Sequence, residues 1–192
     1  MIGNIRPSSL SRTLALVPPA IALVAQQASG AFDIFIKIGD IEGESTDDKH
    51  PRWIQLQSFE WGVKREISTP TPGVAREAGD PSITELTIAK KVDKSTPALF
   101  LNVVGGSEPI PEVILLLQEQ TSMGGVFYRI TLNDVLVSSQ SHTAAAGGDD
   151  KPRENISLNF LKFKIEYFTR DESGKLTPEP PVGYDLSTAK PF

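Results

Sequence analysis

The sequence contains no cysteine, which excludes disulfide bonds, thiol catalysis and thiolate metal ligands. Its two histidines, His50 and His142, lie in polar segments without the spacing of a metal centre. A weak cation site at Asp47, Asp48 and His50 is less favoured than a solvated loop. The net charge of −5 disfavours generic binding to nucleic acid or anionic lipid. Because nucleophile-elbow and phosphate-loop motifs are also absent, we predict a binding or structural protein, not an enzyme, without cofactor or metal.

Long apolar runs are missing except at residues 13–25, a run that is too short to span a membrane and contains Pro18 and Pro19. Basic residues before this run and small residues after it resemble the layout of a secretory signal. Adjacent prolines disfavour the helix that such a signal forms. We therefore predict that residues 1–30 are a flexible extension or a misassigned start, with a signal peptide as the alternative.

The remaining composition fits one globular domain with a real core, since the chain has 192 residues, of which 39% are hydrophobic and 22% charged. Its 15 glycines and 15 prolines indicate many turns and therefore a mostly β chain. The segment Trp53–Gly62 shows the expected alternation. If this segment is a single strand, its aromatic side chains lie on one face. The opposite face then carries Leu56, Ser58 and Glu60.

Apolar alternation also predicts strands over residues 32–38, 83–91, 113–118, 126–133, 135–139 and 156–167. In the last of these, the alternation changes phase between Phe160 and Leu161, which indicates a β-bulge that bends the strand. A capping serine or threonine, a first-turn proline and a closing Gly105-Gly106 pair predict one short α-helix over about residues 95–104.

Polar segments without a period are predicted to form three surface loops, at residues 43–52, 68–81 and 141–155. Lys90 and Lys91 are interpreted as solvated lysines at the end of a strand. The Pro-rich tail, residues 171–192, is expected to pack loosely, with Tyr184 as its main contact.

Six short motifs follow one another along the chain: AFDIFIKI at 31–38, GES at 43–45, SFEWG at 58–62, DKS at 93–95, VLVSS at 135–139 and ENISLNF at 154–160. In this order and spacing, the chain resembles the Hcp family, the haemolysin-coregulated tube proteins of bacterial type VI secretion. The resemblance covers about residues 31–167, and no single motif in it is catalytic. The chain departs from the family in its extra N-terminal residues and at Phe59, where Trp is common.

The resemblance implies a compact β-barrel of two antiparallel sheets with one short side α-helix, formed by residues 31–170. It also implies homo-hexameric rings that stack into a hollow tube. The implied partners are the type VI sheath, spike and baseplate proteins, together with effector proteins that the tube carries and stabilises in its lumen. The implied location is the bacterial cytoplasm before firing and the outside of the cell afterwards, without stable membrane insertion.

Two sets of residues become candidate interaction sites under this resemblance. The first set is expected to line the lumen and consists of Leu56, Ser58 and Glu60. The second is expected to contact a neighbouring subunit or ring and consists of Gly43, Glu44, Ser45, Asp47, Asp48 and His50. The alternative function is a monomeric β-barrel that binds a small molecule or glycan, with a stacking platform formed by Trp53, Phe59 and Trp61.

Overall fold

Alternating apolar residues form strands along most of the described chain. The structure is a computed structural model that describes residues 31–69, 73, 75–106, 108–121, 124–147 and 150–192. The prediction for residues 1–30 lies outside this part. The elements are β1 (Phe32–Ile38), β2 (Ile54–Leu56), β3 (Ser58–Glu60), β4 (Val63–Ile67), β5 (Ala78–Ile83), β6 (Leu86–Lys91), α1 (Thr96–Gly105), β7 (Ile110–Glu119), β8 (Val126–Thr143), β9 (Arg153–Asn159), β10 (Lys162–Arg170), β11 (Leu176–Pro178), β12 (Val182–Asp185) and β13 (Lys190–Pro191). The mostly β class with one short side helix is therefore confirmed.

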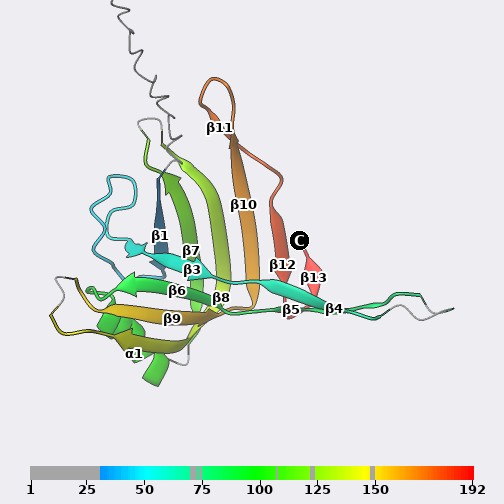
Figure 1. Cartoon of the computed structure of the whole chain (residues 1–192), viewed down its shortest axis with the longest axis horizontal. Helices are drawn as coiled ribbons and strands as arrows, with labels where there is room; N and C mark the ends of the chain where they lie inside the picture. The colour runs from blue at the N-terminus through cyan, green and yellow to red at the C-terminus, as the bar shows by residue number, and fades with distance from the viewer. Residues whose placement is uncertain (1–30, 70–72, 74, 107, 122–123, 148–149) are drawn as a thin grey trace, which may run out of the picture.

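The strands form two antiparallel layers that share β8 (Figure 1). One layer has the order β13-β12-β10-β8-β7-β1-β2, and the other runs from β8 through β9 and β6 to β3. Residues 126–135 of β8 lie in the first layer, whereas residues 136–143 pair with β9. The strand bends at Asp134, just before the two halves meet, and its φ of 54° is a left-handed conformation that Asp tolerates. The two strands predicted here are therefore one continuous bent strand.

A second bend, at Gln57, joins the layers on the opposite side. β2 pairs with β1, β3 pairs with β6, and the Gln57 N–H donates to the Ala89 carbonyl at 2.8 Å. The hydrogen-bonded ladder thus leads from β1 through β2, β3, β6, β9, β8 and β7 back to β1. The single strand predicted over Trp53–Gly62 is wrong, because the side chains change phase at this bend. Leu56 is buried in the core with 6% exposure, whereas Ser58 and Glu60 are exposed.

The core lies between the two layers and is almost entirely aliphatic. Burial of each such side chain contributes about 1.5–3 kcal/mol to folding. α1 covers one end of the core with Leu99. The fully buried aliphatic residues are Ile36, Ile38, Ile54, Leu86, Ile88, Leu99, Val113, Leu115, Ile130, Leu132, Val135, Ile156 and Leu158.

The chain turns a corner between β9 and β10, which lie in different layers. Phe160 faces the core with 5% exposure, whereas Leu161 is 46% exposed. The Leu161 N–H donates to the Asn133 carbonyl at 3.2 Å, so the corner stays attached to β8. The predicted change of phase is confirmed, but it is a corner between two strands and not a bulge within one.

The C-terminal segment, residues 171–192, adds strands to the edge of the first layer. β11 and β12 pair with β10, and β13 pairs with β12. Tyr184 stacks on Phe163 with ring centroids 6.2 Å apart, as expected of the main contact of this segment. The prediction of a loosely packed tail is wrong, because the unpaired edge of β10 offers backbone groups that the tail satisfies.

Part of the loop predicted over residues 68–81 is a β-hairpin. β4 and β5 form a separate two-stranded sheet that projects from the body (Figure 1). Every residue of β4 is exposed, including the apolar Val63 at 67% and Ile67 at 48%. The single chain therefore leaves apolar side chains of this hairpin uncovered.

Candidate functional site

The segment 43–52 lies against the body because backbone hydrogen bonds close it at its base. The Gly43 N–H donates to the Arg52 carbonyl at 2.7 Å. The Arg52 N–H in turn donates to the Ser45 carbonyl at 2.8 Å, and the Ser45 N–H donates to the Trp53 carbonyl at 3.0 Å. A Cβ atom at position 43 would lie 2.3 Å from the Trp53 carbonyl oxygen, so only glycine fits there.

Asp47 closes a tight turn with His50. Its Oδ1 accepts hydrogen bonds from the backbone N–H groups of Lys49 at 3.0 Å and His50 at 2.8 Å, and lies 3.0 Å from His50 Nδ1. Burial raises the pKa of Asp47, but these hydrogen bonds outweigh it and hold the pKa below its usual value. The His50 ring stacks on Phe35 and meets Trp53 edge-on, with centroid distances of 5.2 and 5.0 Å.

Only part of the predicted subunit-contact set reaches the surface. The set divides into buried Gly43 and His50, half-buried Ser45 and Asp47, and exposed Glu44 and Asp48. The two buried members shape the segment and pack it onto the body. The outward-facing side chains of the set are therefore two carboxylates, and a contact through them stays a prediction.

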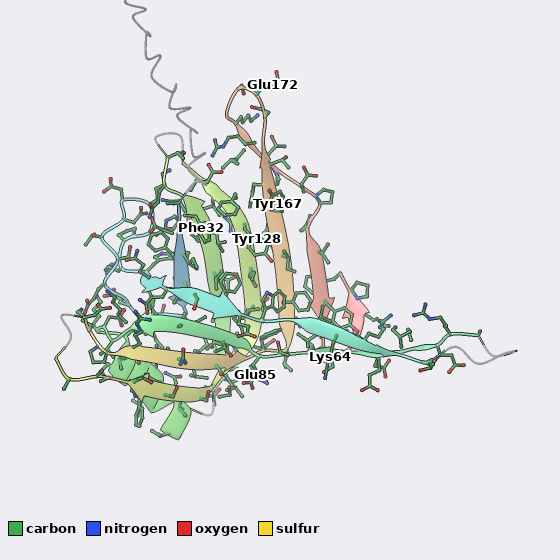
Figure 2. The ribbon with its side chains drawn as sticks, viewed as in Figure 1. Phe32, Lys64, Glu85, Tyr128, Tyr167 and Glu172 are labelled. Atoms are coloured by element: carbon green, nitrogen blue, oxygen red, sulfur yellow. The ribbon has the colours of Figure 1, made fainter. Side chains whose placement is uncertain are left out.

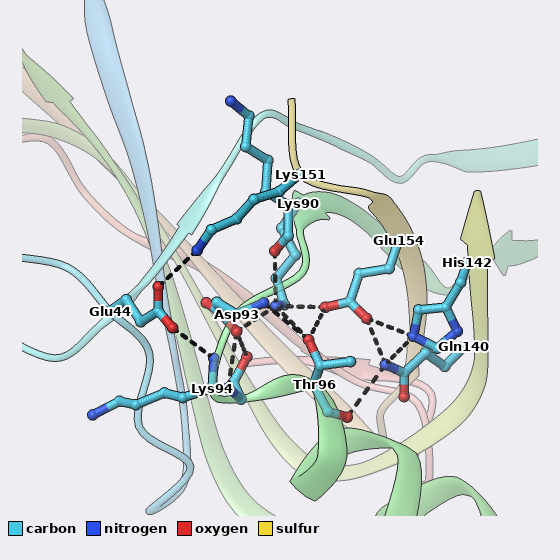
Figure 3. Close-up of polar contacts among 11 residues, drawn as sticks. Glu44, Lys90, Asp93, Lys94, Thr96, Gln140, His142, Lys151 and Glu154 are labelled. Carbon is cyan, nitrogen blue, oxygen red and sulfur yellow. Dashed lines mark hydrogen bonds and ion pairs between the residues drawn. The ribbon is translucent and has the colours of Figure 1, made fainter. Parts of the chain in front are cut away.

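Two glutamates, Glu42 and Glu44, attach this segment to its neighbours, and Figure 3 shows the contacts of Glu44. Glu44 accepts hydrogen bonds from the backbone N–H of Lys94 at 3.0 Å and from Lys151 Nζ at 3.1 Å. Glu42 accepts from Lys94 Nζ at 3.0 Å and from Arg52 Nη1 at 2.6 Å. The Lys94 hydrogen bond and the positive charges of Arg52 and Lys94 lower the pKa of Glu42. Glu42 and Glu44 thus both contact basic residues of their own chain.

Lys90 on β6 is fully buried and pairs with two carboxylates (Figure 3). Its Nζ lies 2.5 Å from Glu154 Oε1 and 2.6 Å from Asp93 Oδ1. Glu154 also accepts hydrogen bonds from Thr96 Oγ1 at 2.8 Å and Gln140 Nε2 at 2.6 Å. The interpretation of Lys90 as a solvated lysine is wrong, because the alternation of β6 directs its side chain to the inner face.

His142 completes this polar network, since its Nε2 lies 3.0 Å from Glu154 Oε2. Burial raises the pKa of Glu154, but hydrogen bonds from Lys90, Thr96 and Gln140 outweigh burial and lower it. The network joins β6, β8, β9 and the start of α1, and one of its buried oxygens, Gln140 Oε1, has no hydrogen-bond partner. In the described ranges, no three His, Asp or Glu side chains are grouped so as to hold a metal ion. We therefore assign the network a role in stability.

The outward face of the layer β3-β6-β9-β8 carries mostly small side chains. The strand registers continue this face to Lys91, Thr143 and Arg153 at one end of the layer. The rest of the face consists of Ser58, Glu60, Thr87, Ala89, Ser139, Ser141, Asn155 and Ser157. Thr87 Oγ1 and Ser157 Oγ lie 3.3 Å apart. We call these eight residues the small-residue face. Of the residues predicted to line a lumen, Ser58 and Glu60 belong to it, whereas Leu56 does not.

The aromatic residues predicted as a stacking platform are not arranged as one. Phe59 and Trp61 pack against the core, and the Trp61 ring meets Phe163 edge-on at 5.1 Å. Trp53 meets His50 edge-on at the base of the segment 43–52. The geometry therefore offers no support for the glycan-binding or small-molecule alternative. No helix in the part of the chain that the structure describes is long and apolar enough to cross a membrane.

The described chain is thus a β-rich body with an outward face of mostly small side chains, a projecting hairpin and a buried polar network. A family profile described as "Type VI secretion system effector, Hcp" matches residues 35–167. The chain therefore belongs to the Hcp family, the tube proteins that bacterial type VI secretion systems secrete.

Individual relatives agree with this assignment. Protein hcp1 of Pseudomonas aeruginosa is 37% identical over 145 residues, which cover 75% of this chain and 88% of the relative. A solved structure described as a type six secretion system protein superimposes with a TM-score of 0.79 at 31% identity, over 84% of this chain and 100% of that one. Hcp1 from Salmonella typhimurium gives a TM-score of 0.67 at 29% identity, over 84% and 99% of the two chains.

Proposed function

We propose that this protein is a tube subunit whose protomers assemble six to a ring, that the rings stack into a hollow tube, and that the lumen carries and stabilises effector proteins. The observation that carries the proposal is the projecting β4–β5 hairpin. An isolated two-stranded hairpin is at best marginally stable in water. This hairpin also exposes Val63 and Ile67, which gain about 25 cal/mol for each Å² that a partner covers.

A second copy of the chain is the partner that such a hairpin fits. The hairpin of one protomer would contact a different surface of the next protomer, because most of the hairpin projects beyond its own body. Head-to-tail contacts of this kind close into rings when the rotation per subunit allows, and they extend into filaments when repeated along an axis. Glu44 and Asp48, the exposed members of the predicted subunit-contact set, are candidates for a further contact between subunits or rings.

The small-residue face is the surface that suits a lumen. Small hydroxyl and amide side chains offer no deep apolar pocket, so proteins of many shapes can lie against them without being held tightly. Glu60 and Ser58 lie at the β3 side of this face. In this proposal, effector proteins contact this face, and the sheath, spike and baseplate proteins contact the remaining surfaces of the tube.

The proposed life cycle follows from these partners. The subunit assembles in the bacterial cytoplasm before firing and is then released outside the cell with its effector. In this role the chain carries no catalysis, binds no cofactor or nucleic acid and does not insert stably into a membrane. Its net charge of −5 agrees with avoidance of anionic polymers and anionic lipid surfaces.

The test is the mass of the full chain in solution by light scattering, with negative-stain images of the same sample. We expect six times the chain mass and ring-shaped particles. The double variant Val63→Asp/Ile67→Asp should lose the rings, because it places carboxylates on the uncovered apolar face of the hairpin. The matched control is Lys64→Ser, on the same strand with its side chain on the opposite face. Rings that persist in the double variant would refute the role of the hairpin, and a monomeric wild type would refute the ring.

A further inference from the structure

We propose that the apolar run at residues 13–25 packs in cis against an uncovered aromatic patch of the same chain. The patch consists of Phe32, Phe127, Tyr128 and Tyr167. It lies on the core-facing side of the first layer, beyond the part that the second layer covers. The proposal does not depend on ring formation.

The strand registers show why this patch is uncovered. Ile34, Leu117, Tyr128 and Tyr167 lie opposite one another across β1, β7, β8 and β10, so they share one face of the layer. Ile34 and Leu117 are each 9% exposed, whereas Tyr167 at the other end of the row is 51% exposed. The upright strands of the first layer extend past β3, β6 and β9, which cross only their lower part (Figure 1).

The aromatic rings gather because of an irregularity in β8. The register between β7 and β8 shifts between Leu117 and Gln118, and Phe127 and Tyr128 consequently both pack against the core. Phe32 meets Phe127 edge-on with ring centroids 6.0 Å apart, although Phe32 itself is 49% exposed. Figure 2 shows Phe32, Tyr128 and Tyr167 in one row along the sheet. A row of half-covered aromatic rings on a core-facing surface is an unfilled packing site.

The chain itself supplies a segment that fits this site. The described chain begins at Ala31, directly before Phe32, and the Ala31 carbonyl accepts a hydrogen bond from the Gln120 N–H at 2.9 Å. Residues 13–25 contain no charged side chain and consist mostly of alanine, leucine and valine. The intervening residues 26–30 reach at most about 18 Å when extended, so the run is tethered close to the patch. Such a tether gives an effective concentration of about millimolar, which favours this segment over a second chain.

Photo-cross-linking of the full chain tests the proposal. A benzophenone amino acid replaces Tyr167, and the cross-linked peptides are mapped by mass spectrometry. We expect cross-links within one chain to residues 13–25, at a yield that does not change with protein concentration. The matched control places the same group at Leu101, which is 66% exposed on α1 and should give no such product.

Substitutions in the run provide the second arm. Ile21→Asp/Leu23→Asp should lower the cross-link yield at Tyr167 by at least about tenfold, because it would bury carboxylates without partners. Gln27→Asp, outside the run, should leave the yield unchanged. Cross-links to a second copy, cross-links only to other segments, or none above the Leu101 control would each overturn the proposal. So would a yield that is indifferent to the double substitution.

Discussion

Replacing Lys90 with methionine should destabilise the protein by about 3 kcal/mol. The substitution keeps much of the side-chain volume but removes the cation that lies 2.5 Å from Glu154 and 2.6 Å from Asp93. Breaking a buried ion pair by removing one partner costs about 3–5 kcal/mol. We take the lower end because Glu154 keeps its hydrogen bonds from Thr96 and Gln140.

The pH dependence identifies the cause of this loss. In the wild type, the pKa of Glu154 is held below the ordinary value of 4.5. Its contribution to stability is therefore present above that value and disappears as the pH falls through the folded-state pKa. In Lys90→Met the pKa of Glu154 should rise, because burial is then less opposed. The difference in stability between variant and wild type should consequently be largest near pH 7 and shrink in acid.

Urea denaturation followed by circular dichroism measures this effect on the full chain. Variant and wild type are compared at one protein concentration, because assembly adds to apparent stability. Lys91→Met is the matched control, since the neighbouring Lys91 is 46% exposed and pairs with Asp150 at the surface. That exposed pair should contribute no more than about 1 kcal/mol. A loss below about 1 kcal/mol in Lys90→Met, or a loss of the same size at every pH, would refute the reasoning.

Two further predictions concern the segment 43–52 and the small-residue face. Gly43→Ala should destabilise the protein by about 1–3 kcal/mol, because its Cβ would lie 2.3 Å from the Trp53 carbonyl oxygen. Thermal denaturation measures this loss, and Gly62→Ala is the control, because a Cβ there has no atom within 4 Å. Equal melting temperatures of the Gly43→Ala and Gly62→Ala variants would contradict the close-contact argument. Glu60→Arg should leave ring assembly intact but change which effector proteins co-purify with the ring, and an unchanged set would contradict a lumenal role for this face.

The sequence predicted individual strands more reliably than their connections. The Phe32–Ile38 strand and the helix after Ser95 were correct, because apolar alternation and helix-end residues act locally. Asp134 was predicted to separate two strands, yet neighbouring strands on both sides keep β8 continuous through it. The tail at Val182–Asp185 was missed because its pairing with β10 depends on an edge that the distant chain creates.

The candidate sites show the same division. Lys90 was judged by its charge, although it occupies an inward position of the alternating strand Leu86–Lys91. Its partner Glu154 lies far away in the sequence. The inward position of Lys90 was therefore the only sequence feature that could have indicated its burial. Leu56 was placed with Ser58 because a single straight strand was assumed, and the bend at Gln57 reversed that placement.

The sequence by itself determined the β class, the position of the helix, most strand cores and the resemblance to the Hcp family, because these depend on local periodicity and on the order of short motifs. Only the tertiary structure decided which strand faces look inward or outward, how the tail pairs, and how Lys90 finds Asp93 and Glu154. The physical reason is that a one-residue irregularity in a strand moves every later side chain to the opposite face of the sheet. Long-range pairing then decides which charges are buried together.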